Sequence, residues 1–216
     1  MTRITEIEIQ CPCCKNRFPT RIWISTTLGP LGTDFFQQAV GSQPILVGIH
    51  ACRFCGYSGY REDFEGEKLS KDLKIFVFKK IMPLTRGREL TPSLKYEVAA
   101  LIAKERGDRS IDVGKLFLRA AWCCTLYEKK EVEEREYRRK AIGHFEKAFE
   151  RGEIDEGLRA RYTYLIGELY RRVGDQEKSL IWFEKVRDAV GGDEGKKWFI
   201  DLAIQQKTNP KEFIGE

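Results

Sequence analysis

Two cysteine pairs near the N-terminus constrain this chain more than any other feature. The first is CPCC at residues 11–14 and the second is CRFC at residues 52–55. Each contains a CxxC step, in which two sulfurs converge while backbone N–H groups of the turn point at them. Two such steps supply four thiolates to one tetrahedral ion, most often zinc. The sequence therefore predicts one Zn²⁺ per chain, with Cys11, Cys14, Cys52 and Cys55 as its ligands.

Other chemistries for these cysteines stay open. The same four thiolates would suit a rubredoxin-like iron centre, and a CxxC pair can also act as a redox dithiol or form a disulfide. Residues 1–10 lack an apolar signal segment, which disfavours disulfides, and no βαβ pattern of the thioredoxin kind follows Cys14. Cys13 and His50 are further candidate ligands, because Cys13 forms a CxC step with Cys11 and His50 lies just before the second pair.

Length and composition are those of a globular protein. The chain has 216 residues, 42% of them hydrophobic, which is enough for one sizeable core and a small metal-stapled module. Uninterrupted apolar runs are all shorter than a bilayer crossing requires. We therefore expect a soluble, cytoplasmic protein with no membrane partner.

The formal net charge of +5 is concentrated in residues 71–110. A basic segment next to a zinc ribbon is one form that a nucleic-acid binding surface takes. A solvated linker and helix face is the alternative, favoured because neither an aromatic platform nor an RGG-type run accompanies the charge. The basic residues at the start of this segment are Lys71, Lys74, Lys79, Lys80, Arg86 and Arg88.

The pattern changes from strands to helices near residue 90. Alternating residues before the first cysteine pair predict a strand around 6–10, and a second strand follows over 18–24. Residues 28–32 read as a turn-rich loop, and 44–50 as a strand that delivers Cys52. Residues 70–82 fit either a buried strand or a helix. We favour a helix that begins after Ser70 and ends at Pro83.

From Thr91 onward the chain predicts amphipathic helices separated by glycine-containing turns. The expected fold class is α+β, mostly α: a zinc-ribbon-like module over 1–69, a basic connecting segment over 70–90, a helical stack over 91–207 and a tail over 208–216. The six predicted helices cover 92–106, 111–127, 133–151, 156–173, 176–190 and 193–207.

These helices resemble tetratricopeptide repeats. In the clearest unit, small Gly167 allows close helix approach, Tyr170 fills the core of the pair and Gly174 turns the chain. A preceding unit echoes it, since Ala141 and Ser179 lie 38 residues apart, against a repeat length of about 34. Ser179 replaces the usual alanine, and the helices over 92–127 match the repeat poorly.

The inner groove of such a stack is lined by the first helix of each pair. Four residues fall on one polar face of the helix over 156–173: Arg161, Tyr164, Glu168 and Arg171. Two arginines and a tyrosine could hold an acidic or C-terminal peptide segment. An ordinary solvated helix face is the alternative interpretation.

Nearly the whole chain is similar to an uncharacterised prokaryotic domain-of-unknown-function family that joins two cysteine knuckles to tetratricopeptide-like helices. The similarity rests on the cysteine start at 11, Asp34-Phe35, Pro44, the CxxCGY run at 52–57, and residues 116–122 and 164–169. Cys13 and Lys15 depart from the pattern, since glycine would be usual at Lys15. The resemblance implies the fold and the metal, and brings no established activity.

A catalytic constellation is not evident in the sequence. The chain has only two histidines, His50 and His144, and lacks the P-loop, GxSxG, HExxH and dinucleotide fingerprints. Cys123 and Cys124 point to different faces of one helix, which suits small core residues better than ligands. We therefore expect a non-enzymatic adaptor that binds a protein partner, with a nucleic-acid-binding protein and a thiol redox protein as the alternatives.

Overall fold

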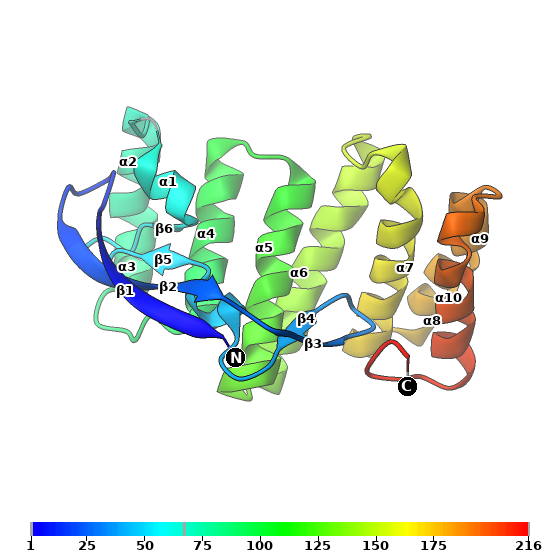
Figure 1. The fold of residues 1–216 in the computed structure, drawn as a ribbon. Helices are drawn as coiled ribbons and strands as arrows, with labels where there is room; N and C mark the ends of the chain where they lie inside the picture. Colours follow the sequence, from blue (N-terminus) through cyan, green and yellow to red (C-terminus); the bar gives the residue numbers. More distant parts are fainter. Residues whose placement is uncertain (1, 67, 216) are drawn as a thin grey trace.

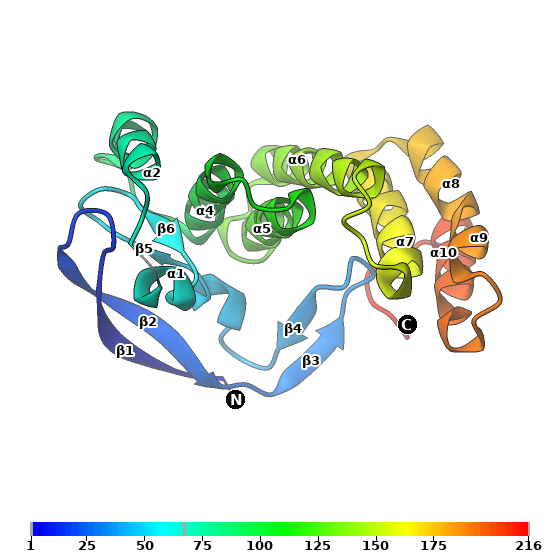
Figure 2. The same cartoon turned by 90° about the horizontal axis from the view of Figure 1, so that it is seen from above.

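The computed structural model describes residues 2–66 and 68–215, which form a row of helices with a thin layer of strands along one side (Figure 1, Figure 2). The strands precede the helices in sequence, so the predicted α+β, mostly α class is confirmed. Each strand pairs antiparallel with one neighbour. The pairs are β1 (Arg3–Gln10) with β2 (Arg17–Ser25), β3 (Leu28–Leu31) with β4 (Gln37–Ala39), and β5 (His50–Ala51) with β6 (Ser58–Gly59).

The β1–β2 hairpin confirms the two strands expected around the first cysteine pair, and other expectations in this half are wrong. Residues 28–32 contain strand β3 instead of a free loop, because they pair with β4. Residues 44–50 form the 3₁₀ helix η1 (Pro44–Val47), followed by the short strand β5. Pro44 stands in the first turn of η1, where its missing N–H leaves no helical hydrogen bond unmade.

The basic segment after residue 70 is helical, as favoured from the sequence. Helix α1 (Arg61–Glu65) precedes it, and α2 (Lys71–Phe76), the π-helical turn η2 (Val77–Ile81) and α3 (Met82–Thr85) then run on without a break. The Ser70 hydroxyl accepts a hydrogen bond from the Leu73 N–H and caps the helix as predicted. The predicted stop at Pro83 is wrong, because the wider π turn accommodates the proline and the helix continues to Thr85.

The remaining helices follow the predicted boundaries closely. Neighbours in the row pack against one another, with α4 on α5, α5 on α6, α6 on α7 and α7 on α8. The last two predicted helices are each divided by a local irregularity. The elements are α4 (Pro92–Arg106), α5 (Ser110–Cys123) with the π turn η3 (Cys124–Glu128), α6 (Glu131–Glu150), α7 (Glu156–Val173), α8 (Gln176–Glu184), α9 (Val186–Val190), η4 (Glu194–Lys196) and α10 (Trp198–Thr208).

Two apolar cores lie side by side along the row. The larger one fills the stack from α4 to α10 and also takes in Phe35 and Ile49 from the N-terminal half. The smaller one surrounds the cysteines and is closed by residues of α2, η2 and α4. Helix α4 contributes to both cores, since Leu94 and Val98 face the cysteines while Tyr96 and Ala100 face the stack. The strand module therefore packs directly on the first helix of the stack.

Candidate metal centre

The first cysteine pair lies in the turn that joins β1 to β2. The Cys11 N–H donates to the Asn16 carbonyl oxygen at 2.9 Å, and the Lys15 N–H donates to the Cys11 carbonyl oxygen at 3.0 Å. Closing this turn requires Lys15 to adopt a φ of 66°, in the left-handed region. The turn holds Cys11 fully buried and Cys14 partly exposed.

The second pair repeats the same arrangement between β5 and β6. The Cys52 N–H donates to the Tyr57 carbonyl oxygen at 2.8 Å, and the Gly56 N–H donates to the Cys52 carbonyl oxygen at 2.7 Å. Gly56 has a φ of 78°, at the place that Lys15 takes in the first turn. The two turns therefore have equivalent structures, and each contributes two sulfurs to the same cluster.

The four predicted ligands meet. The sulfurs of Cys11, Cys14, Cys52 and Cys55 all lie within 4.8 Å of one another. Cys11 Sγ is 3.6 Å from Cys55 Sγ, and Cys14 Sγ is 3.5 Å from Cys52 Sγ. A tetrahedral ion with metal–sulfur bonds of about 2.3 Å separates its sulfurs by about 3.8 Å. The cluster thus has the donor set and the dimensions of a four-thiolate metal site.

The electrostatics of the cluster favour a cation at its centre. The contact with Cys52 raises the pKa of the Cys11 thiol to about 12, and the same contact lowers the pKa of Cys52. Four thiolates at this separation repel one another, and a dication removes that repulsion. The amide of Asn16 also lies 3.4 Å from Cys14 Sγ, where it donates to the most exposed of the four sulfurs.

The other candidate ligands lie outside the cluster. Cys13 is buried beside it but does not belong to the four sulfurs that converge. His50 is buried too, with its Nδ1 2.9 Å from Thr20 Oγ1 and its ring packed edge-on against Phe64. Cys123 and Cys124 lie in the core of the helical stack, as expected for small apolar residues.

The predicted peptide groove does not exist as proposed. Tyr164 and Glu168 are both fully buried, so they offer no surface to a partner. Glu168 is instead bound by Arg171 at 2.8 Å and by Arg172 at 2.7 Å. Only Arg161 of the four residues is exposed, with its guanidinium 4.7 Å from the centre of the Phe35 ring.

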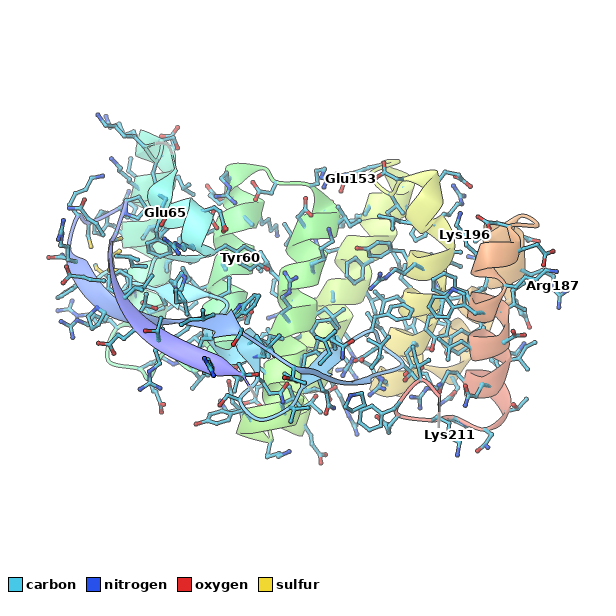
Figure 3. The ribbon with its side chains drawn as sticks, in the orientation of Figure 1. Tyr60, Glu65, Glu153, Arg187, Lys196 and Lys211 are labelled. Atoms are coloured by element: carbon cyan, nitrogen blue, oxygen red, sulfur yellow. The ribbon has the colours of Figure 1, made fainter. Side chains whose placement is uncertain are left out.

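The groove is filled by a distant part of the chain. Thr33 lies in the β3–β4 connection, and its hydroxyl donates to Glu168 at 2.8 Å and lies 3.2 Å from the Lys211 carbonyl oxygen. The β3–β4 segment thus crosses the stack and meets the C-terminal tail near Lys211 (Figure 1, Figure 3). Periodicity within one helix carries no information about such a covering segment.

Sequence reasoning also missed a buried ion pair that anchors this segment. Asp34 Oδ2 accepts hydrogen bonds from Arg138 and from the Trp122 indole, each at 2.8 Å. Burial alone would raise the pKa of the Asp34 carboxyl, but Arg138 and Arg172 lower it to about 2. The one available signal was Asp34-Phe35 itself, among the positions that match the family pattern.

A four-cysteine metal-site candidate on a small strand module, packed against a helical stack, defines the class of this protein. The chain belongs to the family described as an uncharacterized protein conserved in bacteria (DUF2225), whose model matches residues 4–209. No curated protein and no solved structure matches the chain. Among the described helices, none combines the length and apolar composition that a membrane crossing needs.

Proposed function

We propose that the four cysteines hold one structural zinc ion in a non-enzymatic adaptor protein whose helical stack binds a protein partner. The closed four-sulfur cluster carries the proposal. Cys11, Cys52 and Cys55 are buried, and four thiolates fill a tetrahedral shell without leaving a position for a substrate. Iron bound by the same ligands is the second metal to consider. The thiolate ligands suit a reducing compartment, which supports a cytoplasmic location.

The small size of the strand module supports a structural role for the metal ion, because such a module needs a further cross-link to be stable. The strands β5 and β6 have two residues each, and isolated two-stranded pairs are marginally stable in water. A metal ion would join residues 11–14 to residues 52–55, which the chain itself connects only through the long segment 15–51. The sulfurs also belong to one apolar core with Phe18, Leu73 and Val77, so the ion would fix the hairpin against the helix at α2.

The adaptor role is supported by the helical stack. Two helix pairs use one packing device: Gly114 receives the ring of Phe145, and Gly167 receives the ring of Phe183. This device suits a tetratricopeptide-like stack, an architecture that presents surface to other proteins. The last helices carry exposed large apolar side chains where a terminal repeat needs a polar face. These residues are Leu180, Ile181, Trp198 and Ile204.

Metal content with adjacent cysteine variants tests the zinc site. Elemental analysis of purified protein is expected to give one zinc per chain, and Cys14→Ser is expected to lose most of it. The matched control is Cys13→Ser, because Cys13 lies one residue away but outside the cluster. Metal-free protein with an oxidised Cys11–Cys14 pair would sink the zinc proposal and favour the redox alternative.

Site-specific photo-crosslinking in the native host tests the adaptor proposal. A photoreactive residue at Ile181 is expected to capture a discrete partner protein. The control position is Arg187, which is exposed on the next helix. Equal capture at both positions, or none at either, would argue against a partner surface on the last helices.

One observation favours nucleic acid as a second candidate function. The basic segment packs directly on the cysteine core through Leu73, Val77 and Ile81, while Phe78 is exposed between its lysines. Arg53 also stacks over the exposed Phe54 ring at 5.0 Å, next to the second knuckle. Exposed aromatic rings beside basic side chains are the usual means of binding single strands.

A salt titration tests this second candidate. Nucleic-acid binding would weaken steeply with salt concentration, because binding releases counterions. Neutralising Lys79, Lys80, Arg86 and Arg88, all exposed, should then abolish the binding of RNA and DNA oligonucleotides. Binding that survives these substitutions would exclude this surface.

A further inference from the structure

A pocket of about 820 Å³ lies between the N-terminal layer and the helical stack. Figure 2 shows how the N-terminal layer, with β2, β4 and the segment after β4, faces the row from α4 to α7. The volume falls within the range of about 300–1,000 Å³ that is common for small-molecule sites. The cysteine cluster does not line this pocket, and none of the roles proposed above uses it.

The helical wall of the pocket is built from equivalent faces of α5 and α7. On each helix the lining positions are one turn apart and combine an arginine with an aromatic and an aliphatic residue. Arg161, the exposed member of the predicted groove, belongs to this wall. These residues are Leu118, Arg119 and Trp122 on α5, and Arg161, Tyr162 and Leu165 on α7; Lys115 and Leu158 line the pocket from the same two helices.

The remaining walls add further large apolar side chains. Trp23 and Ile45 face the pocket from the strand layer, and the fully buried Phe145 contributes from α6. Tyr60 closes the end next to α1 and lies at the junction between the strand module and the middle helices (Figure 3). The lining thus offers flat apolar surface on both sides of the space, with charged and polar side chains among it.

The charge in the pocket is positive and two of its cations lack an acidic partner. Within the described residues, no ion pair joins Arg119 or Arg161 to a carboxylate. Arg119 donates to the Tyr60 hydroxyl, and Arg161 stacks on the Phe35 ring. The other two cations, Arg61 and Lys115, are each paired with a carboxylate.

The two carboxylates that line the pocket do not neutralise Arg119 and Arg161. Asp34 is buried in its ion pair with Arg138 at 2.8 Å. Glu62 is the other lining carboxylate, and it is exposed to solvent. Arginine in a partly desolvated site binds carboxylate, sulfonate and phosphate groups through charge-assisted hydrogen bonds.

We propose that this pocket binds a small organic anion with an aromatic or other flat apolar body. The acidic group lies between Arg119 and Arg161, and the body packs between the helical wall and the strand layer. Such a ligand gives both guanidinium groups an acidic partner, which no described carboxylate provides, and it covers the aromatic lining. This binding activity is independent of the zinc and partner roles proposed above.

Titration with 1-anilinonaphthalene-8-sulfonate tests the proposal, because this probe joins a sulfonate to a flat aromatic body. The folded, metal-loaded full chain is expected to bind one probe per chain, saturably and with enhanced fluorescence. N-phenyl-1-naphthylamine, which has a similar body without the sulfonate, is expected to bind at least tenfold more weakly. Equal affinity for the two probes would overturn the role of the arginines.

Substitutions locate the probe. Arg161→Gln is expected to weaken binding about tenfold or more, since one charge-assisted contact is lost. The matched control is Arg159→Gln on the same helix, whose side chain instead stacks on Phe149 and pairs with Glu156. Arg119→Lys provides a second variant that keeps the charge near Tyr60 but loses the planar group, and it is expected to weaken binding less than Arg161→Gln does.

Circular dichroism confirms that each variant is folded before titration. Unchanged probe affinity in Arg161→Gln, or equal losses in Arg161→Gln and Arg159→Gln, would overturn the proposal. Native mass spectrometry of the protein purified from its host gives an independent readout. A bound small anion that leaves when Arg161 is substituted supports the proposal, and a bound peptide at the same site contradicts it.

Discussion

Lys15 and Gly56 occupy equivalent places in the two cysteine turns, yet only one of them is a glycine. Both residues have a positive φ, 66° for Lys15 and 78° for Gly56. A side chain in this region costs about 1–2 kcal/mol per residue, and glycine escapes that cost. Space differs as well, because a Cβ on Gly56 would lie 2.2 Å from Thr85 Oγ1. The second turn thus demands glycine, while the first tolerates lysine under strain.

Opposite substitutions at these two positions are expected to have opposite effects. Gly56→Ala should lower the free energy of unfolding by about 2 kcal/mol or more, from backbone strain and the contact with Thr85. Lys15→Gly should raise it by about 0.5 kcal/mol, because relief of strain exceeds the added entropy of the unfolded chain. Denaturant titration of metal-loaded protein measures both. A loss of stability in Lys15→Gly would show that the first turn depends on the lysine side chain.

Asp34 makes the stability of the protein depend on pH in the acid range. Its pKa is lowered from 3.8 to about 2 by Arg138 and Arg172, against the effect of burial. Because the folded value lies below the unfolded one, the stabilisation is complete above pH 4 and is lost as the pH falls toward 2. The shift corresponds to about 2 kcal/mol.

Asp34→Asn is therefore expected to cost about 3 kcal/mol near neutral pH, since the buried Arg138 and the partly buried Arg172 lose a charged partner. The difference in unfolding free energy between wild type and variant should shrink between pH 4 and pH 2. Urea titrations across that range measure it. The control is Asp188→Asn, an exposed carboxylate, for which the difference should stay near zero. If the difference in unfolding free energy between wild type and Asp34→Asn did not change with pH, the lowered pKa of Asp34 would be contradicted.

The helices were predictable because residues at or next to their ends mark where they begin and end. Thr91-Pro92 opens α4, and Gly107, Gly174 and Gly191 end helices with positive φ values. The same holds for the four cysteines, since two local spacings sufficed to place them together. Signals of this kind act within a few residues.

Features that depend on distant contacts could not be predicted. Strand β3 contains Gly29 and Pro30, and its conformation follows from pairing with β4. The predicted groove on α7 failed for the same reason, because Thr33 covers Glu168 from 135 positions away in the sequence. Amphipathic periodicity identifies the face of a helix that carries charge, without telling what packs against it.

Two helical glycines make close packing between helices testable. A Cβ on Gly167 would lie 2.7 Å from Cδ1 of Phe183, whereas a Cβ on Gly143 of α6 would meet nothing within 4 Å. Gly167→Ala is expected to destabilise the protein by about 1–2 kcal/mol, because overpacking outweighs the better helix propensity of alanine. Gly143→Ala should stabilise it by about 0.5–1 kcal/mol. Thermal and denaturant unfolding measure both, and equal effects would contradict close approach of α7 and α8.

The whole molecule is divided by its two cores and joined by α4. The smaller core contains Cys11, Cys52, Cys55 and the residues of α2 and η2 that cover them. The larger core is built from the stack and needs no cysteine of the cluster. Because α4 has one face in each core, loss of the smaller core would expose one side of the first helix of the stack. Among the described residues, the helices beyond α4 contribute no side chain to the smaller core.

Removal of the metal is therefore expected to unfold the strand module while the far end of the stack stays folded. Hydrogen exchange followed by mass spectrometry, before and after chelation, should show faster exchange in residues 3–25, 50–59 and 71–85. Exchange in α6–α9 should stay unchanged, because those helices draw their stability from the larger core. Cys14→Ser should reproduce the pattern without a chelator. If exchange became faster uniformly along the chain, the two cores would fold as one unit. If exchange did not change after chelation, the metal ion would have no structural role.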